Sequence, residues 1–141
     1  MATPVPINKI LVPVDLTDSS RLALRYAIEL GNALGASTLD VLHVWDAPGG
    51  QTLADFVLCE HGETMQALLA DAEHKGRFVV HGRLEVGQPA PRSIVDVAEE
   101  GYDLIVMGSR AGLDEPSVTE EVARNARCPV FTVREGADEP E

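Results

Sequence analysis

The chain has 141 residues, 45% of them hydrophobic, which fits one compact domain with a single core. Its formal net charge is −12 and its Lys and Arg residues are scattered, which argues against binding to nucleic acid or to an anionic membrane surface. No apolar run approaches the roughly 20 residues that cross a bilayer, and the first residues lack the pattern of a secretory signal. The two cysteines, Cys59 and Cys128, indicate no disulfide framework, so we expect a cytoplasmic protein with reduced thiols.

The first half of the chain alternates strand-like and helix-like segments. A β-branched run over Ile10–Val14 predicts the first strand. Polar residues typical of helix N-caps follow it, and apolar residues then recur at helical spacing until Gly35, a typical helix stop. The apolar run Thr38–Trp45 predicts a second strand, of the kind found in parallel sheets covered on both faces. Residues 46–76 are less clear and indicate helix with a break at Gly62.

The second half continues the alternation. Phe78–Val86 predicts a third strand, and a helical segment follows it and ends at Gly101. Tyr102–Met107 predicts a fourth, buried strand. Ser117 begins a capping-box pattern that opens a last helix. Cys128–Val133 predicts the fifth strand.

This succession of strands and helices predicts an α/β fold. We expect a doubly wound, open, five-stranded parallel sheet with helices on both faces. No internal repeat or second domain is visible, so residues 1–141 are expected to form a single domain, with residues 1–8 and 135–141 flexible at its ends.

Five short motifs occur in an order and at a spacing that resemble the universal stress protein family (UspA-like, single-domain members). They are Val12-Pro13-Val14-Asp15, Leu42-His43-Val44, Glu85-Val86-Gly87-Gln88-Pro89, Leu104-Ile105-Val106-Met107-Gly108 and Cys128-Pro129-Val130. The resemblance extends from Lys9 to Arg134. It implies a Rossmann-like, adenine nucleotide alpha hydrolase-like fold with strand order 3-2-1-4-5. Members of this family either bind ATP or have lost that ability.

The implied strand order reverses between the first and fourth strands, and open α/β sheets bind ligands at such a switch point, beyond the C-terminal ends of the strands. The resemblance therefore implies a candidate adenine-nucleotide site there. Its candidate residues are Pro13, Asp15, Val44, Met107, Gly108, Gly112, Ser117 and Val118. The residue types alone also allow a structural role for Asp15 as the N-cap of the first helix, and one residue can serve both purposes.

The loop after Gly108 departs from the family's ATP-binding pattern, G-x2-G-x9-G-[ST]. Ala111 stands at the second glycine, with Gly112 one position further on, and Pro116-Ser117 replaces the final Gly-Ser pair. The loop is also shorter than the pattern requires. Proline removes one backbone N–H just where a phosphate would need donors, which indicates a degenerate ATP-binding loop.

Two carboxylates, Asp114 and Glu115, lie in the same short loop. Each close pair of a carboxylate and a phosphate costs on the order of 1–4 kcal/mol near a protein surface. We therefore predict a non-catalytic stress-response or regulatory protein. The alternative is a protein that binds ATP or another adenine nucleotide, with Mg²⁺ bridging these carboxylates and the phosphates and with slow hydrolysis as a weaker option.

The last predicted strand is short, apolar and at the edge of the sheet. Edges of this kind invite pairing with another chain, and the resemblance implies a homodimer joined through this strand, with Val130, Phe131 and Val133 at the interface. Alternatively, the acidic tail of the chain covers this edge and no dimer forms through it. A further alternative is that the partner is a different protein. His43 is expected to be packed and hydrogen-bonded, not catalytic.

Overall fold

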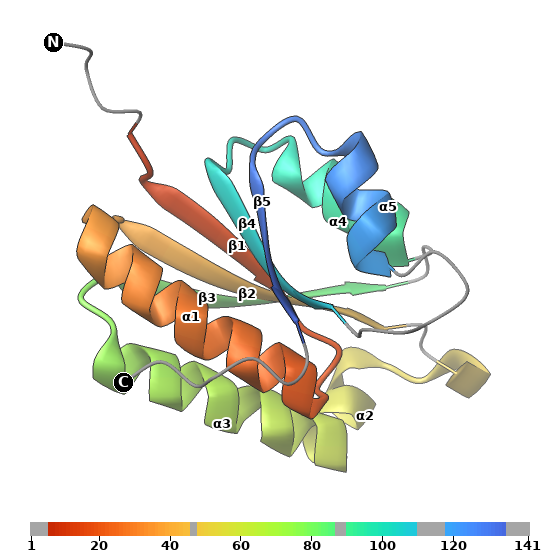
Figure 1. The fold of residues 1–141 in the computed structure, drawn as a ribbon. Coiled ribbons are helices and arrows are strands. Elements are labelled where there is room, and N and C mark those ends of the chain that lie inside the picture. Colours follow the sequence, from red (N-terminus) through yellow and green to blue (C-terminus); the bar gives the residue numbers. More distant parts are fainter. Residues whose placement is uncertain (1–5, 46–47, 87–89, 110–117, 135–141) are drawn as a thin grey trace, which may run out of the picture.

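The computed structural model describes residues 6–45, 48–86, 90–109 and 118–134. These residues form one five-stranded parallel sheet with the order β3-β2-β1-β4-β5 (Figure 1). The strands are β1 (Lys9–Pro13), β2 (Thr38–Trp45), β3 (Val79–Val86), β4 (Leu104–Ser109) and β5 (Val130–Arg134). The predicted fold class and strand order are confirmed.

Helices cover both faces of the sheet (Figure 1). They are α1 (Asp18–Leu34), α2 (Leu53–Leu58), α3 (Glu60–Lys75), α4 (Ala90–Ala98) and α5 (Val118–Asn125), with a short 3₁₀ turn η1 (Pro48–Gly50) before α2. Helices α1, α2 and α3 pack on one face, and α4 and α5 pack on the other. This arrangement leaves β3 and β5 as the two edges of the sheet.

Alternate residues of the central strands enter different halves of the core. Ile10 and Val12 of β1 pack under α1, whereas Leu11 between them packs under α4 and α5. In β4, Val106 packs in the half of the core under α1, and Ile105 packs in the half under α4 and α5. Because both faces of each central strand are buried, every position favours an apolar residue. This is the physical basis of the continuous apolar runs in the sequence.

Helix α1 begins and ends at signals that the sequence contains. Thr17 is the N-cap residue, in extended conformation, and Gly35 is the C-cap residue with a left-handed backbone (φ 70°). The Gly35 amide donates to the Gly31 carbonyl and closes the helix. A residue with a Cβ would be strained in that conformation.

The predicted break in the region 46–76 lies at a different residue. Cys59 ends α2 and precedes α3, so the break is three positions before Gly62, which lies in the first turn of α3. A Cβ on Gly62 would stand only 2.2 Å from the carbonyl oxygen of Phe56. The glycine therefore allows the two helices to approach closely and does not interrupt the helix.

The chain before β1 is held by hydrogen bonds from residue 8 onward, in contrast to the predicted flexibility of residues 1–8. The Asn8 amide donates to the carboxylate of Asp103 at 2.9 Å, and its carbonyl accepts from Ser37 at 2.8 Å. Ile7 packs against the core under α1. Residues 1–5 and 135–141 lie outside the described part of the chain.

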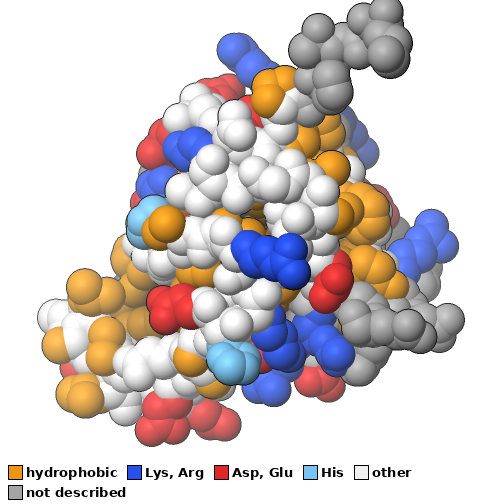
Figure 2. Space-filling view, turned by 90° about the vertical axis from the view of Figure 1, so that its left-hand side faces the viewer, with side chains coloured by type: hydrophobic (Ala, Val, Ile, Leu, Met, Phe, Trp, Pro, Cys, Tyr) orange, Lys and Arg blue, Asp and Glu red, His pale blue; other side chains and the backbone are white. Residues whose placement is uncertain are grey.

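Surface charge is mixed on the face that Figure 2 presents. Acidic and basic side chains stand close to one another there, and hydrophobic side chains gather toward its lower left. Within the described residues, none of the helices is both long and apolar enough to span a bilayer.

Candidate functional site

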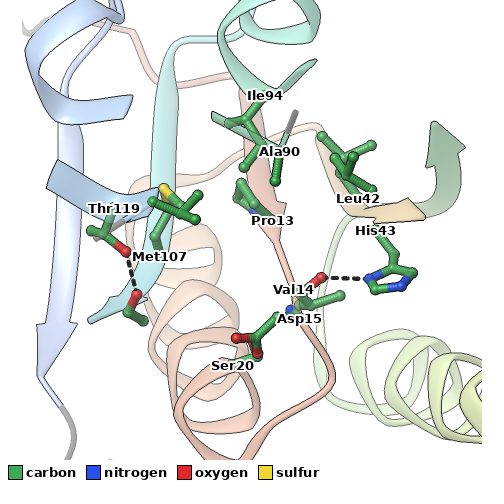
Figure 3. Close-up of a pocket in the computed structure, with 13 residues that line it drawn as sticks. Pro13, Val14, Asp15, Ser20, Leu42, His43, Ala90, Ile94, Met107 and Thr119 are labelled. Atoms are coloured by element: carbon green, nitrogen blue, oxygen red, sulfur yellow. Dashed lines mark hydrogen bonds between the residues drawn. The ribbon is translucent and has the colours of Figure 1, made fainter. Parts of the chain in front are cut away.

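A cleft of about 120 Å³ lies at the C-terminal ends of β1, β2 and β4, where the strand order reverses (Figure 3). The first turn of α1 and residues of α4 and α5 complete its walls. Six of the eight predicted site residues line this one cleft: Pro13, Asp15, Val44, Met107, Gly108 and Val118. The other two, Gly112 and Ser117, lie outside the described residues.

Asp15 is held in place by its own loop and by α1. Its Oδ1 accepts hydrogen bonds from the Thr17 amide at 3.0 Å, the Thr17 hydroxyl at 2.5 Å and the Ser20 hydroxyl at 2.6 Å. The Asp15 amide in turn donates to the Ser20 oxygen at 2.8 Å. Thr17 is the N-cap residue, so Asp15 is not the cap and instead closes the turn that leads into α1.

Leu16, directly after Asp15, has a positive φ of 68°. This left-handed conformation is uncommon for a residue with a branched side chain. The Leu16 side chain packs against the core under α1, which helps to hold the backbone there. The turn lets the chain leave β1 while Asp15 stays at the mouth of the cleft. Backbone strain like that of Leu16 is typical of functional sites.

Gly108 forms the β4 side of the cleft and has little space around it. A Cβ at this position would stand 2.4 Å from the Ser19 hydroxyl and 2.6 Å from the Ser19 carbonyl oxygen. The Gly108 carbonyl accepts from the Thr119 hydroxyl at 2.5 Å, which ties the start of α5 to β4 (Figure 3). Glycine is thus needed here so that β4 can approach the start of α1, independently of any ligand.

His43 is packed and hydrogen-bonded, as predicted. Its Nδ1 lies 2.8 Å from the Val14 carbonyl oxygen (Figure 3). Because a carbonyl oxygen only accepts, Nδ1 carries the proton and donates. The ring stacks on Phe56 at a centroid distance of 5.5 Å. His43 also lines the cleft, which the sequence did not indicate.

The cleft has an apolar wall and a polar end. The apolar part is formed by Pro13, Leu42, Val44, Ile94 and Met107, and the polar groups come from Asp15, Ser20, His43 and Thr119. An apolar slot with a few convergent polar groups is typical of small-molecule sites. The arrangement fits a nucleoside, because a flat base can lie against the apolar wall while sugar hydroxyls face the carboxylate.

A second polar cluster stands on the α4 side of the sheet, at the opposite end of β2. The Tyr102 hydroxyl donates to the buried Asp40 carboxylate, which also contacts His81 at 2.8 Å. Burial, together with the hydrogen bond to Asp40, raises the pKa of Tyr102 to about 12. Arg83 bonds to the Glu100 carboxylate at 3.1 Å, which raises the pKa of Arg83 and lowers that of Glu100. This cluster links β2 and β3 to the start of β4.

The sequence profile described as the universal stress protein family matches residues 6–134. The chain belongs to the universal stress protein family. The matched region includes every strand of the sheet and every residue of the cleft described above.

Individual universal stress proteins resemble this one over most of their length. The protein named Universal stress protein MJ0531, from Methanocaldococcus jannaschii, is 33% identical, over 90% of this chain and 82% of the relative. A solved universal stress protein from Archaeoglobus fulgidus is 30% identical, with a TM-score of 0.74 over 89% of this chain and 92% of its own. An Archaeoglobus fulgidus universal stress protein solved in complex with dAMP is 27% identical, with a TM-score of 0.70 over 91% of this chain and 98% of its own.

Several cleft residues of this universal stress protein were not identified from the sequence. Ser20 and Thr119 are buried hydroxyl residues at the starts of α1 and α5, and Ala90 and Ile94 come from the start of α4. The signal that was present is the density of small hydroxyl residues after Asp15, which is also typical of a helix start. Only the fold shows which of these side chains turn toward the cleft.

Proposed function

We propose that this universal stress protein binds an adenine nucleotide through its adenosine part and acts as a non-catalytic regulator. The observation that carries the proposal is the cleft at the strand-switch point, with its apolar wall and the anchored carboxylate of Asp15 at one end. The dAMP complex of the Archaeoglobus fulgidus relative supports an adenine nucleotide as the ligand class. Val44 and Met107 would contact the base, and Asp15 would accept from the sugar hydroxyls.

The phosphates of the ligand are expected to add little to its affinity. The loop sequence between β4 and α5 contains Pro116, which offers no N–H, and the carboxylates of Asp114 and Glu115. A triphosphate brings more negative charge toward these groups than a monophosphate does. We therefore infer a preference for adenosine or AMP over ATP, with Mg²⁺ required only if it bridges the carboxylates and a phosphate.

The same proposal includes a homodimer in the cytosol, joined along β5. The Phe131 ring lies tilted against that of Tyr26 at a centroid distance of 6.3 Å. Phe131 is still 40% exposed at this edge, so it can contact a second copy. Val133 is only 3% exposed and packs in the core under α1, so its side chain would not reach a partner. In the proposed dimer, Val133 contributes through the backbone of the strand.

Titration calorimetry with AMP tests the site. We expect binding to the nucleotide-stripped protein, and at least tenfold weaker binding to the Asp15→Ala and Gly108→Val variants, about 1.4 kcal/mol. Asp18→Ala is the matched control, because Asp18 is an exposed acid of the first turn of α1 outside the cleft lining. Equal affinity of the wild type and both cleft variants would place the ligand elsewhere. No heat with AMP or adenosine would overturn the proposed function.

A further inference from the structure

We propose that β3 is a self-association surface, at which two copies of this chain pair their β3 strands antiparallel about a two-fold axis at Leu84. β3 pairs with β2 along its whole length, and among the described residues no strand pairs with its other side. This edge lies across the sheet from β5, so the inference does not depend on the proposed function or on its β5 dimer.

The backbone of β3 determines which residues can bond to an added strand. The Val79 amide donates to the carbonyl of Ser37, just before β2, at 3.0 Å. Because the bonding direction alternates along a strand, the odd-numbered residues of β3 bond toward β2. The N–H and C=O groups of Gly82, Leu84 and Val86 therefore point away from the sheet. About an axis at Leu84, the two copies of Leu84 can exchange hydrogen bonds, and Gly82 of each copy can do so with Val86 of the other.

The charged side chains of β3 are complementary to themselves in this register. Arg83 and Glu85 lie on the same face of the strand and form an ion pair at 2.9 Å, with side chains 28% and 39% exposed. Directly opposed residues of an antiparallel pair also share one face. With the axis at Leu84, Arg83 of each copy thus lies opposite Glu85 of the other. The four side chains form a square in which neighbouring charges alternate in sign.

Neighbouring registers lack this complementarity. An axis at Arg83 places the two arginines opposite each other, and an axis at Glu85 does the same with the two glutamates. An axis at Gly82 places Arg83 opposite His81 and Glu85 opposite Val79. Like charges directly opposite each other are destabilising, so the charges of β3 favour the axis at Leu84.

The other face of the same edge carries exposed apolar side chains that a second copy would cover. Leu53 and Val57 of α2 are 63% and 43% exposed and line a groove of about 180 Å³, and Leu84 also lines this groove. A two-fold axis at Leu84 therefore brings the α2 helices of the two copies toward each other. Val86, 51% exposed, lies at the same edge. Exposed apolar patches of this kind typically mark interaction sites.

Hydrogen exchange of individual amides, followed by NMR on the full chain, tests the proposal. Each copy has a net charge of −12, so we expect association at high protein concentration. As the concentration rises to the millimolar range, exchange of the Gly82, Leu84 and Val86 amides should slow by about tenfold. Pairing through β5 would leave these amides unchanged, so the two interfaces are distinguished. Wild-type exchange rates independent of concentration would overturn the proposal.

Two charge reversals test the register. Glu85→Arg should abolish the protection, because four arginines would meet at the axis, and Arg83→Glu should abolish it by bringing four carboxylates together. An equimolar mixture of the two variants should regain it, since each arginine then lies opposite a glutamate. Glu73→Arg, at an exposed acid of α3, is the matched control and should behave like the wild type.

A change on the apolar face provides a test that leaves the charges intact. Leu53→Ser, at a side chain that is 63% exposed, should reduce the protection of the β3 amides without affecting the fold. Protection retained in Leu53→Ser or in either single charge variant would overturn the proposal. So would a mixture of the two charge variants that stays unprotected while both retain the circular dichroism spectrum of the wild type.

Discussion

The Ser20 hydroxyl joins two groups of Asp15: its oxygen accepts from the Asp15 amide at 2.8 Å and it donates to the Asp15 Oδ1 at 2.6 Å. The side chain is buried, so this pair of bonds fixes both the backbone and the carboxylate at the mouth of the cleft. Ser20 is therefore a positioning residue for the carboxylate that we expect to face the ribose.

Ser20→Ala should weaken adenosine binding by about five- to tenfold, about 1.0–1.4 kcal/mol, because Asp15 loses its two bonds to Ser20 while those from Thr17 remain. The measurement is calorimetry with adenosine and with 2′,3′-dideoxyadenosine, which lacks the sugar hydroxyls. Binding of the dideoxy compound should be nearly the same in both proteins. Ser93→Ala, at a buried serine of α4 outside the cleft lining, is the control. If Ser20→Ala lowered the affinity for adenosine and for dideoxyadenosine equally, Ser20 would have a structural role only.

Gly108→Ala should destabilise the fold as well as the site. The new methyl group would stand 2.6 Å from the backbone oxygen of Ser19, which cannot move without shifting α1. Forcing an atom into such a packed position costs about 1–3 kcal/mol. Urea unfolding of the variant and of Ser109→Ala, the next residue of β4, measures this. Unchanged stability of Gly108→Ala would show that α1 and β4 are further apart than described.

Alkaline pH should reveal the contact between Tyr102 and Asp40. The pKa of Tyr102 is about 12 in the fold, against an ordinary value of 10.0, so the folded protein keeps the proton longer than the unfolded chain. This contribution to stability is complete below pH 10 and is lost as the pH rises toward 12. The loss should be on the order of 2 kcal/mol. Tyr102→Phe should unfold with a flatter pH dependence in that range, and identical slopes would contradict the prediction.

The β5 edge can be tested by removing one outward-facing hydrogen-bond donor. The Pro129 carbonyl accepts from the Ile105 amide of β4, so the backbone of the next residue, Val130, faces away from the sheet. Val130→Pro should therefore abolish dimer formation while leaving the contact with β4 intact. Size-exclusion chromatography with light scattering measures the mass. A monomeric wild-type protein at micromolar concentration would exclude the proposed dimer.

The two thiols should differ in reactivity. Cys59 is exposed between α2 and α3, whereas Cys128 is partly covered, and burial raises the pKa of the Cys128 thiol. Since the thiolate is the reactive form, iodoacetamide at pH 8 should alkylate Cys59 at least about tenfold faster. Mass spectrometry of digested samples taken over time follows both sites. Equal rates would indicate that Cys128 is more accessible than the structure shows.

Much of the fold was predictable because its signals are local or repeated. The two-sided burial of Ile10, Leu11 and Val12 requires an apolar run, and Gly35 ends α1 through a backbone conformation that favours glycine. The break between α2 and α3 was assigned to Gly62 because a glycine in a helical pattern resembles a stop. Its actual role depends on contact with Phe56 of another helix, and no local pattern contains that information.

The candidate site was predictable where strands supply the residues. Pro13, Val44 and Met107 follow from strand ends and from the family resemblance, and all three line the cleft. Among the residues supplied by helix starts, Val118 was predicted, whereas Ser20 and Thr119 were missed. A hydroxyl such as that of Thr119 has the same sequence signature whether it caps a helix or, as here, bonds to a strand carbonyl.

The most direct test of the proposed adenosine site is one calorimetric series on the nucleotide-stripped protein, with adenosine, AMP and ATP plus Mg²⁺ as successive ligands. The account predicts that adenosine and AMP bind with similar affinity and that ATP binds at least tenfold more weakly, because the loop sequence after β4 contains two carboxylates and a proline. Tighter binding of ATP than of adenosine would contradict it, since the phosphates would then contribute most of the affinity.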